Sequence, residues 1–256
     1  IRAWSDGVAV GIQASASSTP LVERALRGAI TDWEIAPFRP PPSRARACYA
    51  GLISHAGAPA WAPLRALDAA RGTDPLAALL EAVQPLGPDE QMLIRYLVWP
   101  ADGERVARIR STITSAAPTR GWLGLLELAT NTAPRRPRFD AALQRQIERR
   151  LSEPLFELIG AVALFGDDRE RLTSRAASLT AAYRSQFDAG VGGLTLANWG
   201  WQSEARPASA APARRATLPT VLVTDGELAS LWHPPSSQVQ IPGIVHLRRP
   251  VSVISP

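Results

Sequence analysis

Residues 74–100, DPLAALLEAVQPLGPDEQMLIRYLVWP, carry the clearest helix and strand signals of this 256-residue chain. Asp74 is a favourable helix N-cap and Pro75 suits the first turn, and apolar side chains follow them at helical spacing. After a Gly-Pro turn, the segment 90–100 is apolar on both faces apart from Arg95. The sequence therefore predicts a helix followed by a central strand of a sheet.

Elements of the same two kinds alternate along the rest of the chain. Apolar runs bounded by turn residues predict strands over 7–14, 47–56, 156–165, 191–199 and 218–224. Caps and apolar stripes at helical spacing predict helices within 17–33, 138–156, 168–187 and 226–232. Thr224 and Glu227 have the spacing of a capping box at the start of the last helix. The order of elements after residue 138 thus repeats that of the first half.

We therefore predict an α+β fold of two similar halves, each a mixed or antiparallel sheet with helices packed on one side, plus a helical insertion. The first half spans 1–100, the insertion 101–137 and the second half 138–201. Residues 202–216 are rich in Ala, Pro, Ser and Arg, which predicts a flexible loop. Residues 217–256 predict a strand, a short helix and a linker.

All 28 basic residues are arginine, because the chain contains no lysine. A phosphate-binding loop of the Walker type uses a lysine to reach the terminal phosphates, so this chain cannot contain that nucleotide site. The single cysteine, Cys48, lies in an apolar segment, where an inert buried thiol in a reducing compartment is expected. No run approaches the roughly 20 apolar residues that a membrane span needs. We expect a cytoplasmic chain, alone or at the periphery of a membrane.

Histidines and glycines give no catalytic motif. His55, His233 and His246 lie in three different segments, and no H-x-x-x-H, H-E-x-x-H or cysteine pair predicts a metal site. Gly192 and Gly193 follow a predicted helix rather than a strand, which is the reverse of a dinucleotide-binding loop. No G-x-S-x-G elbow accompanies the serines. We predict no catalytic residue, cofactor or metal.

Two acidic pairs also have structural explanations. Asp89 with Glu90, and Asp167 with Asp168, fall at turns, where capping and solvation account for them. An enzyme whose site is assembled from scattered residues is still an alternative class, because such parts converge only in space.

Arginine clusters suggest a different alternative, contact with nucleic acid. The formal net charge is +5, and phosphate backbones attract clustered basic side chains. Solvated basic faces are the competing explanation. The arginines proposed for DNA contact are Arg135, Arg136, Arg138, Arg214 and Arg215.

Three segments carry motifs that occur together in one known family. ELASLWHPPSSQVQIPGI (227–244) is similar to an E-L-A-x-L-[WY]-H-x-P pattern followed by a V-x-x-P-G-I-like stretch. The segment 73–100 is similar to a D-P-L-x-x-L-L helix with its following strand. The segment 149–187 is similar to a K-L-x-x-P-x-F-E-V-x-I-R-V strand and helix, although Arg150 replaces the usual lysine and Gly160 and Ala161 stand where a polar-to-arginine strand is common. The three segments resemble the region that precedes the motor domain in HerA-like and type IV secretion DNA-translocating ATPases.

The resemblance implies a non-catalytic assembly or docking region, with ATP hydrolysis belonging to a motor domain beyond residue 256. It implies protein partners in a secretion or transfer assembly, with homo-oligomers, DNA and membrane proximity as further expectations. The proposed docking residues lie in the best-matching segment, and a buried anchor that closes the domain is the alternative role for them. They are Leu228, Leu231, Trp232 and His233.

Overall fold

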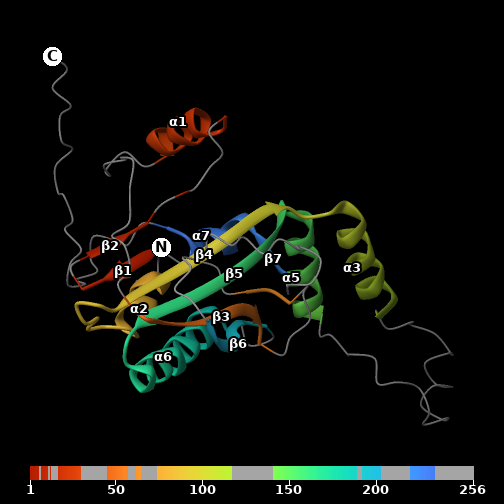
Figure 1. The fold of residues 1–256 in the computed structure, drawn as a ribbon. Coiled ribbons are helices and arrows are strands. Elements are labelled where there is room, and N and C mark those ends of the chain that lie inside the picture. The colour runs from red at the N-terminus through yellow and green to blue at the C-terminus, as the bar shows by residue number, and fades with distance from the viewer. Residues whose placement is uncertain are drawn as a thin grey trace, which may run out of the picture.

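The computed structural model describes residues 1–5, 7–10, 12, 17–29, 45–56, 62–64, 74–116, 141–188, 192–202 and 220–233. Within these ranges the chain forms seven strands and six helices (Figure 1). The strands are β1 (Arg2–Trp4), β2 (Gly7–Ala9), β3 (Ala47–His55), β4 (Gln91–Pro100), β5 (Leu155–Gly166), β6 (Leu194–Gln202) and β7 (Val221–Thr224). The helices are α1 (Thr19–Ala29), α2 (Pro75–Glu81), α3 (Gly103–Ala116), α5 (Ala141–Ser152), α6 (Arg169–Phe187) and α7 (Asp225–Leu231).

All seven strands join one antiparallel sheet. Six of them follow the order β2-β1-β4-β5-β3-β6, and β7 pairs with β5 outside this order. One edge of β5 pairs with β4 from Phe156 to Phe165. The other edge pairs with β3 over residues 161–166 and with β7 over residues 155–158, so β3 and β7 follow one another along it. Strand β5 is therefore hydrogen-bonded to three other strands.

The units β3-α2-β4 and β5-α6-β6 interlock within this sheet. Strands β3 and β4 are both antiparallel to β5, so they run parallel to each other and β5 fills the gap between them. In the same way β3 fills the gap between β5 and β6. This is the ferredoxin-like βαββαβ arrangement.

The α+β class and the antiparallel sheet agree with the sequence prediction, whereas the two halves do not form a sheet each. The two long strands of the first half, β3 and β4, are separated by β5, and the two strands of the second half, β5 and β6, are separated by β3. The two halves therefore share one sheet because neither can satisfy the backbone hydrogen bonds of its own strands.

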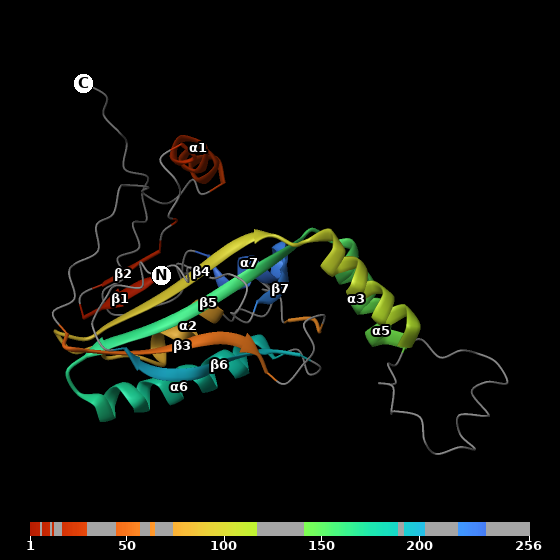
Figure 2. The ribbon, with the colours of Figure 1, turned by 45° about the vertical axis from the view of Figure 1, so that its right-hand side comes forward.

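The predicted insertion also differs from the structure. Helix α3 lies within it, but α5, which we expected to belong to the second half, packs beside α3 through Ile109, Ile147 and Leu151. The two helices project together beyond the end of the sheet (Figure 2). We call α3 and α5 the arm. Residues 117–140, which connect them, lie outside the described residues.

The main core lies between the sheet and helices α2 and α6 on one of its faces (Figures 1 and 2). Strand β5 contributes Leu158, Val162 and Leu164, which are all 0% exposed. Tyr96 of β4 and Tyr183 of α6 share an O–H···O hydrogen bond of 2.9 Å inside this core. Burial raises the pKa of both phenols, so both keep their protons.

The predicted helix starts are confirmed by their hydrogen bonds. The Asp74 carboxylate accepts from two backbone N–H groups of α2, and the Asp168 carboxylate accepts from one of α6. Thr224 and Glu227 form both bonds of the capping box of α7. Local signals of this kind fix where each helix begins, because they satisfy N–H groups that have no partner within the helix.

Glu90 is a correction to the sequence analysis, which assigned it to a solvated turn. Its carboxylate is buried and accepts from the backbone N–H of Gly87 at 2.7 Å and from Arg175 of α6 at 2.8 Å. Arg175 also donates to the carbonyl oxygens of Val83 and Pro85. Glu90 and Arg175 therefore link helix α6 to the turn that follows α2.

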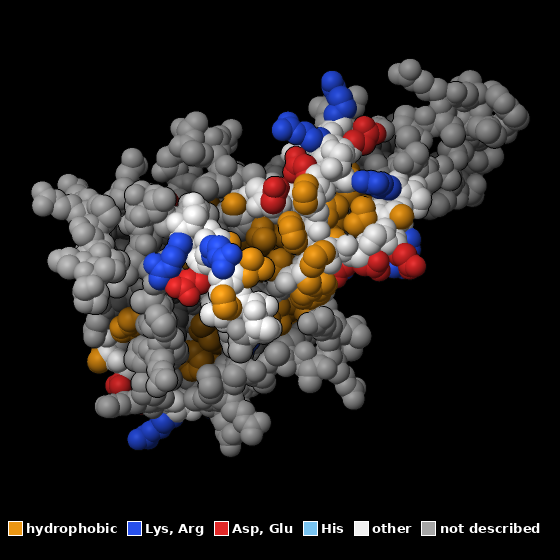
Figure 3. Space-filling view, turned by 90° about the horizontal axis from the view of Figure 1, so that it is seen from above, with side chains coloured by type: hydrophobic (Ala, Val, Ile, Leu, Met, Phe, Trp, Pro, Cys, Tyr) orange, Lys and Arg blue, Asp and Glu red, His pale blue; other side chains and the backbone are white. Residues whose placement is uncertain are grey.

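On the opposite face of the sheet, Cys48 packs with Ala163 and Phe165. Its thiol is buried, and burial raises its pKa, as expected for an inert cysteine. The space-filling view of this face shows an apolar band along its middle (Figure 3). Among the described residues, no helix is long and apolar enough to cross a membrane.

Gly160 has no side chain, and the side chain of Ile53 occupies the space where one would lie. It lies opposite Tyr96 in the sheet, and a Cβ atom there would lie 2.5 Å from Cδ1 of Ile53. We expect Gly160→Ala to lower the free energy of unfolding by about 1–3 kcal/mol through overpacking, as measured by urea denaturation. Gly103→Ala is the matched control because no atom lies within 4 Å of its added carbon. An equal loss in both variants would contradict this explanation.

Candidate functional site

Two ion pairs lie where the base of the arm meets the body of the protein. Arg105 of α3 forms an ion pair of 3.0 Å with Glu157 of β5 and donates to the Thr220 hydroxyl. Because Arg105 is on α3 and Glu157 on the central strand, this pair links the first helix of the arm directly to the sheet.

The second link is a buried ion pair between α5 and α7. Arg150 is 3% exposed, and its Nε and Nη2 atoms each donate to the Glu227 carboxylate at 2.9 Å. Nη2 also donates to the carbonyl oxygen of Leu222 in β7. A two-point contact of this kind fixes the orientation of both side chains.

Glu227 has further partners that satisfy its buried carboxylate. It accepts from the backbone N–H of Leu64 at 2.7 Å and from that of Thr224 at 2.9 Å. A carboxylate that receives a guanidinium and two backbone N–H groups keeps its charge stabilised inside the protein. The Arg150–Glu227 pair therefore joins the arm, β7, α7 and the segment around Leu64 in one network.

His55, at the end of β3, lies near this network. Both of its ring nitrogens are buried and have no hydrogen-bond partner among the described residues. Burial, and next the positive charge of Arg150, lower the pKa of His55 to about 4, with a smaller opposing effect from Glu227 and a further lowering from Arg105. The imidazole is therefore neutral near pH 7.

A third polar link involves two residues from separate motifs of the sequence analysis. The Nε2 atom of His233 lies 2.7 Å from Oδ1 of Asp74, and its Nδ1 atom lies 3.0 Å from the carbonyl oxygen of Ala229. Asp74 uses the same oxygen to cap α2. His233 thus connects the end of α7 to the start of α2.

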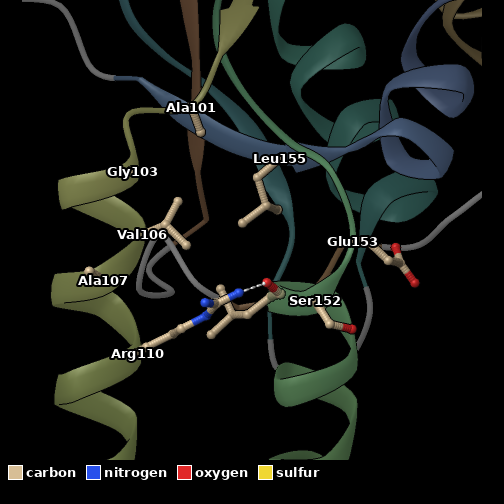
Figure 4. A pocket seen from close by; sticks show the side chains of 9 residues that line it. Ala101, Gly103, Val106, Ala107, Arg110, Ser152, Glu153 and Leu155 are labelled. Atoms are coloured by element: carbon tan, nitrogen blue, oxygen red, sulfur yellow. Dashed lines mark hydrogen bonds between the residues drawn. The ribbon is translucent and has the colours of Figure 1, made fainter.

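Between the two helices of the arm lies a hollow of about 270 Å³ (Figure 4). Arg110 reaches across it from α3 and donates to the carbonyl oxygen of Leu151 at 2.5 Å, while Glu153 points away from Arg110 (Figure 4). The hollow is lined by Ala101, Gly103, Val106, Ala107, Arg110, Leu151, Ser152, Glu153 and Leu155.

The structure brings the four proposed docking residues together at the end of α7. Leu231 is 1% exposed, and Leu228 and Trp232 are half-buried against the main core. His233 is tied to Asp74. These positions favour the alternative that the sequence analysis left open, an anchor that closes the domain.

The five arginines proposed for DNA contact lie outside the described residues, as do residues 234–256. Of the predicted loop 202–216, the structure describes only Gln202, which is the last residue of β6 rather than part of a loop. Sequence reasoning did not identify Arg105, Arg150 or Glu157 as a cluster. One signal in the sequence could have indicated the contact between Arg150 and Glu227. These residues lie in the segments 149–187 and 227–244, which both resemble motifs of the same family. Within the described ranges, no group of three His, Cys, Asp or Glu side chains is placed to bind a metal ion.

Comparison with known proteins found no matching family model, no matching curated protein and no matching solved structure.

Replacement of Arg150 tests the buried pair. Arg150→Met should lower the free energy of unfolding by about 3–5 kcal/mol, because it leaves the Glu227 charge buried without its partner. The double variant Arg150→Met, Glu227→Gln should recover part of this loss, since no unpaired charge is left. Arg149→Met is the matched control, because the adjacent Arg149 side chain is 84% exposed and its ion pair with Glu153 is worth little. Equal losses for Arg150→Met and Arg149→Met in thermal and urea unfolding would contradict the assignment.

His55 should make stability depend on pH. Its pKa is about 4 in the folded chain against 6.5 for a free histidine, so the unfolded chain binds the proton more readily. Its contribution to stability is therefore complete above pH 6.5 and is lost as the pH falls toward 4, by up to about 3 kcal/mol. Urea unfolding between pH 6.5 and 4 should show that the free energy of unfolding falls less steeply with decreasing pH for His55→Gln than for the original chain. The same pH dependence in both proteins would refute the role of His55.

Proposed function

We propose that this chain is a non-catalytic assembly region of a DNA-translocating ATPase of the HerA-like or type IV secretion kind. The proposal starts from three motifs that occur in the expected order along the sequence. In this proposal the chain positions and docks protein partners, and the motor that hydrolyses ATP belongs to another domain or subunit.

The observation that carries the proposal is that residues of these motifs are bonded to one another. Asp74 of the segment 73–100 contacts His233 of the segment 227–244 at 2.7 Å. Arg150 of the segment 149–187 contacts Glu227 of the segment 227–244 at 2.9 Å. Motifs that are distant in sequence thus form one connected unit, which supports treating them as parts of one fold rather than as three unrelated similarities.

The arm is the element that we assign to docking. Two ion pairs at its base, Arg105–Glu157 and Arg150–Glu227, link each of its helices to the body. A protruding element that is fixed at its base can present a surface to a partner without losing much conformational entropy on binding. The hollow between its helices is lined mainly by small and apolar side chains and suits an apolar side chain of a partner protein.

DNA binding is the second candidate function, and a charge count supports it. Residues 101–153 contain ten arginines and six carboxylates, which gives most of the net charge of +5 in one part of the chain. Arg135, Arg136 and Arg138 belong to this region. Phosphate contacts made by such arginines would weaken steeply with added salt.

The test combines the purified chain with the motor domain of a HerA-like translocase encoded beside it or in frame with it. We expect the two proteins to co-elute on size-exclusion chromatography and ATP hydrolysis to require the motor domain. Ala107→Glu places a charge in the hollow of the arm and should weaken binding by about tenfold or more, measured by calorimetry. Ser178→Glu, at an exposed position of α6, should bind like the original chain.

Two results would overturn the proposal. One is ATP hydrolysis by the chain alone, and the other is no association with the motor domain at any concentration tested. Salt-sensitive binding of a labelled DNA duplex that is lost when Arg135, Arg136, Arg138, Arg214 and Arg215 are replaced by Ala would favour the second candidate function.

A further inference from the structure

The outer face of α6 borders a groove that none of the described segments fills. The groove has a volume of about 720 Å³ and lies between α6 and the edge strand β6. Its lining is mostly small or apolar, and it is made by Tyr49, Leu196 and Trp199 of the sheet together with eight residues of α6 and its end: Thr173, Ala176, Ala177, Thr180, Ala181, Arg184, Ser185 and Asp188.

The residues of α6 that border this groove form one stripe. At 3.6 residues per turn, five of the positions that line the groove, 173, 177, 180, 184 and 188, fall together with Arg169 within an arc of about 100°. Of these, Arg169, Thr173, Ala177, Arg184 and Asp188 are exposed, while Thr180 is half-buried. The middle of the stripe is small, so another backbone can approach it closely.

The stripe is complementary to itself when it is reversed. If two copies of α6 pack antiparallel with their centres between positions 178 and 179, Arg169 of each copy lies opposite Asp188 of the other. In the same register, Ala177 lies opposite Thr180. Both ends of the contact therefore pair opposite charges, and the centre pairs small side chains, as a two-fold symmetric interface requires.

Aromatic side chains hold Arg169 at one end of the groove. Its guanidinium carbon lies 4.7 Å from the ring centre of Trp201. Trp201 contacts Tyr49 with ring centres 4.5 Å apart, and Tyr49 stacks on Trp199 at 5.2 Å. Trp199 donates to the hydroxyl of Thr180 on α6. The charged end of the stripe is thus positioned before any partner binds, which reduces the entropy lost on association.

Addition of a further strand to β6 is disfavoured by its backbone. Asn198 has φ of 54°, and the pairing of β6 with β3 shifts register between Ala50 and Leu52. A bulge of this kind bends an edge strand and interrupts the hydrogen-bonding row that an added strand would need. Contacts made by side chains of α6 are therefore the favoured mode of recognition.

We propose that a second copy of this chain occupies the groove, with the two α6 helices packed antiparallel across a two-fold axis. This inference does not depend on the proposed function, because it concerns how the chain pairs with itself. Helix α6 has 19 residues and is about 28 Å long, so the contact is of modest size. We expect such a contact to give a reversible dimer, which forms in the micromolar range.

The experiment is sedimentation velocity of the full chain across the micromolar range. We expect the sedimentation coefficient to rise with concentration as dimers form. Ala177→Glu places a charge at the centre of the contact and should weaken dimerisation by about tenfold or more. Ser178→Glu is the matched control, because Ser178 is exposed, lies outside the stripe and does not line the groove, and it should dimerise normally. Circular dichroism melting checks that both variants are folded.

Charge reversal tests the antiparallel register itself. Arg169→Asp and Asp188→Arg should each weaken dimerisation, because each brings like charges together at both ends of the contact. The double variant should restore it, since opposite charges again face each other. A chain that is monomeric throughout the concentration range, or a double variant that is weaker than both single variants, would overturn the proposal.

Discussion

Strand β5 pairs along both of its edges, and the arrangement of the other elements follows from this. It bonds with β4 on one side and with β3 and β7 on the other. Its side chains Leu158, Val162 and Leu164 also face the helices of the main core. A strand with neighbours on both edges and helices on one face fixes the register of three strands at once, because a slip of one residue would move its apolar side chains to the other face.

The polar network at the base of the arm extends this order beyond the sheet. Glu157 on β5 and Glu227 on α7 each receive an arginine from one helix of the arm. Buried ion pairs contribute little net stability compared with apolar packing, but they define one geometry, since an unpaired buried charge is strongly unfavourable. Their chief effect here is to set the direction in which the arm leaves the body.

Local features were predictable from the sequence, and long-range ones were not. The caps Asp74, Asp168 and Thr224 act within a few residues, so the sequence alone indicates where α2, α6 and α7 begin. The approach of Arg150 to Glu227 depends on pairing β5 with β7, which no local pattern encodes. For this reason the single shared sheet, the arm and the network at its base were missed. The burial of Leu231 agrees with the buried anchor that the sequence analysis gave as the alternative role for the proposed docking residues.

The pairing of β3 with β5 has a consequence for biosynthesis. Partner residues in these strands are more than 100 positions apart in the chain, with Ala47 opposite Gly166. Loop-closure entropy makes such non-local contacts slow to form. During translation, β3 leaves the ribosome long before β5 does. Its backbone therefore has no partner strand, and its apolar side chains are exposed, until β5 has been made. An apolar strand that has no partner is prone to aggregation until the second half has been synthesised.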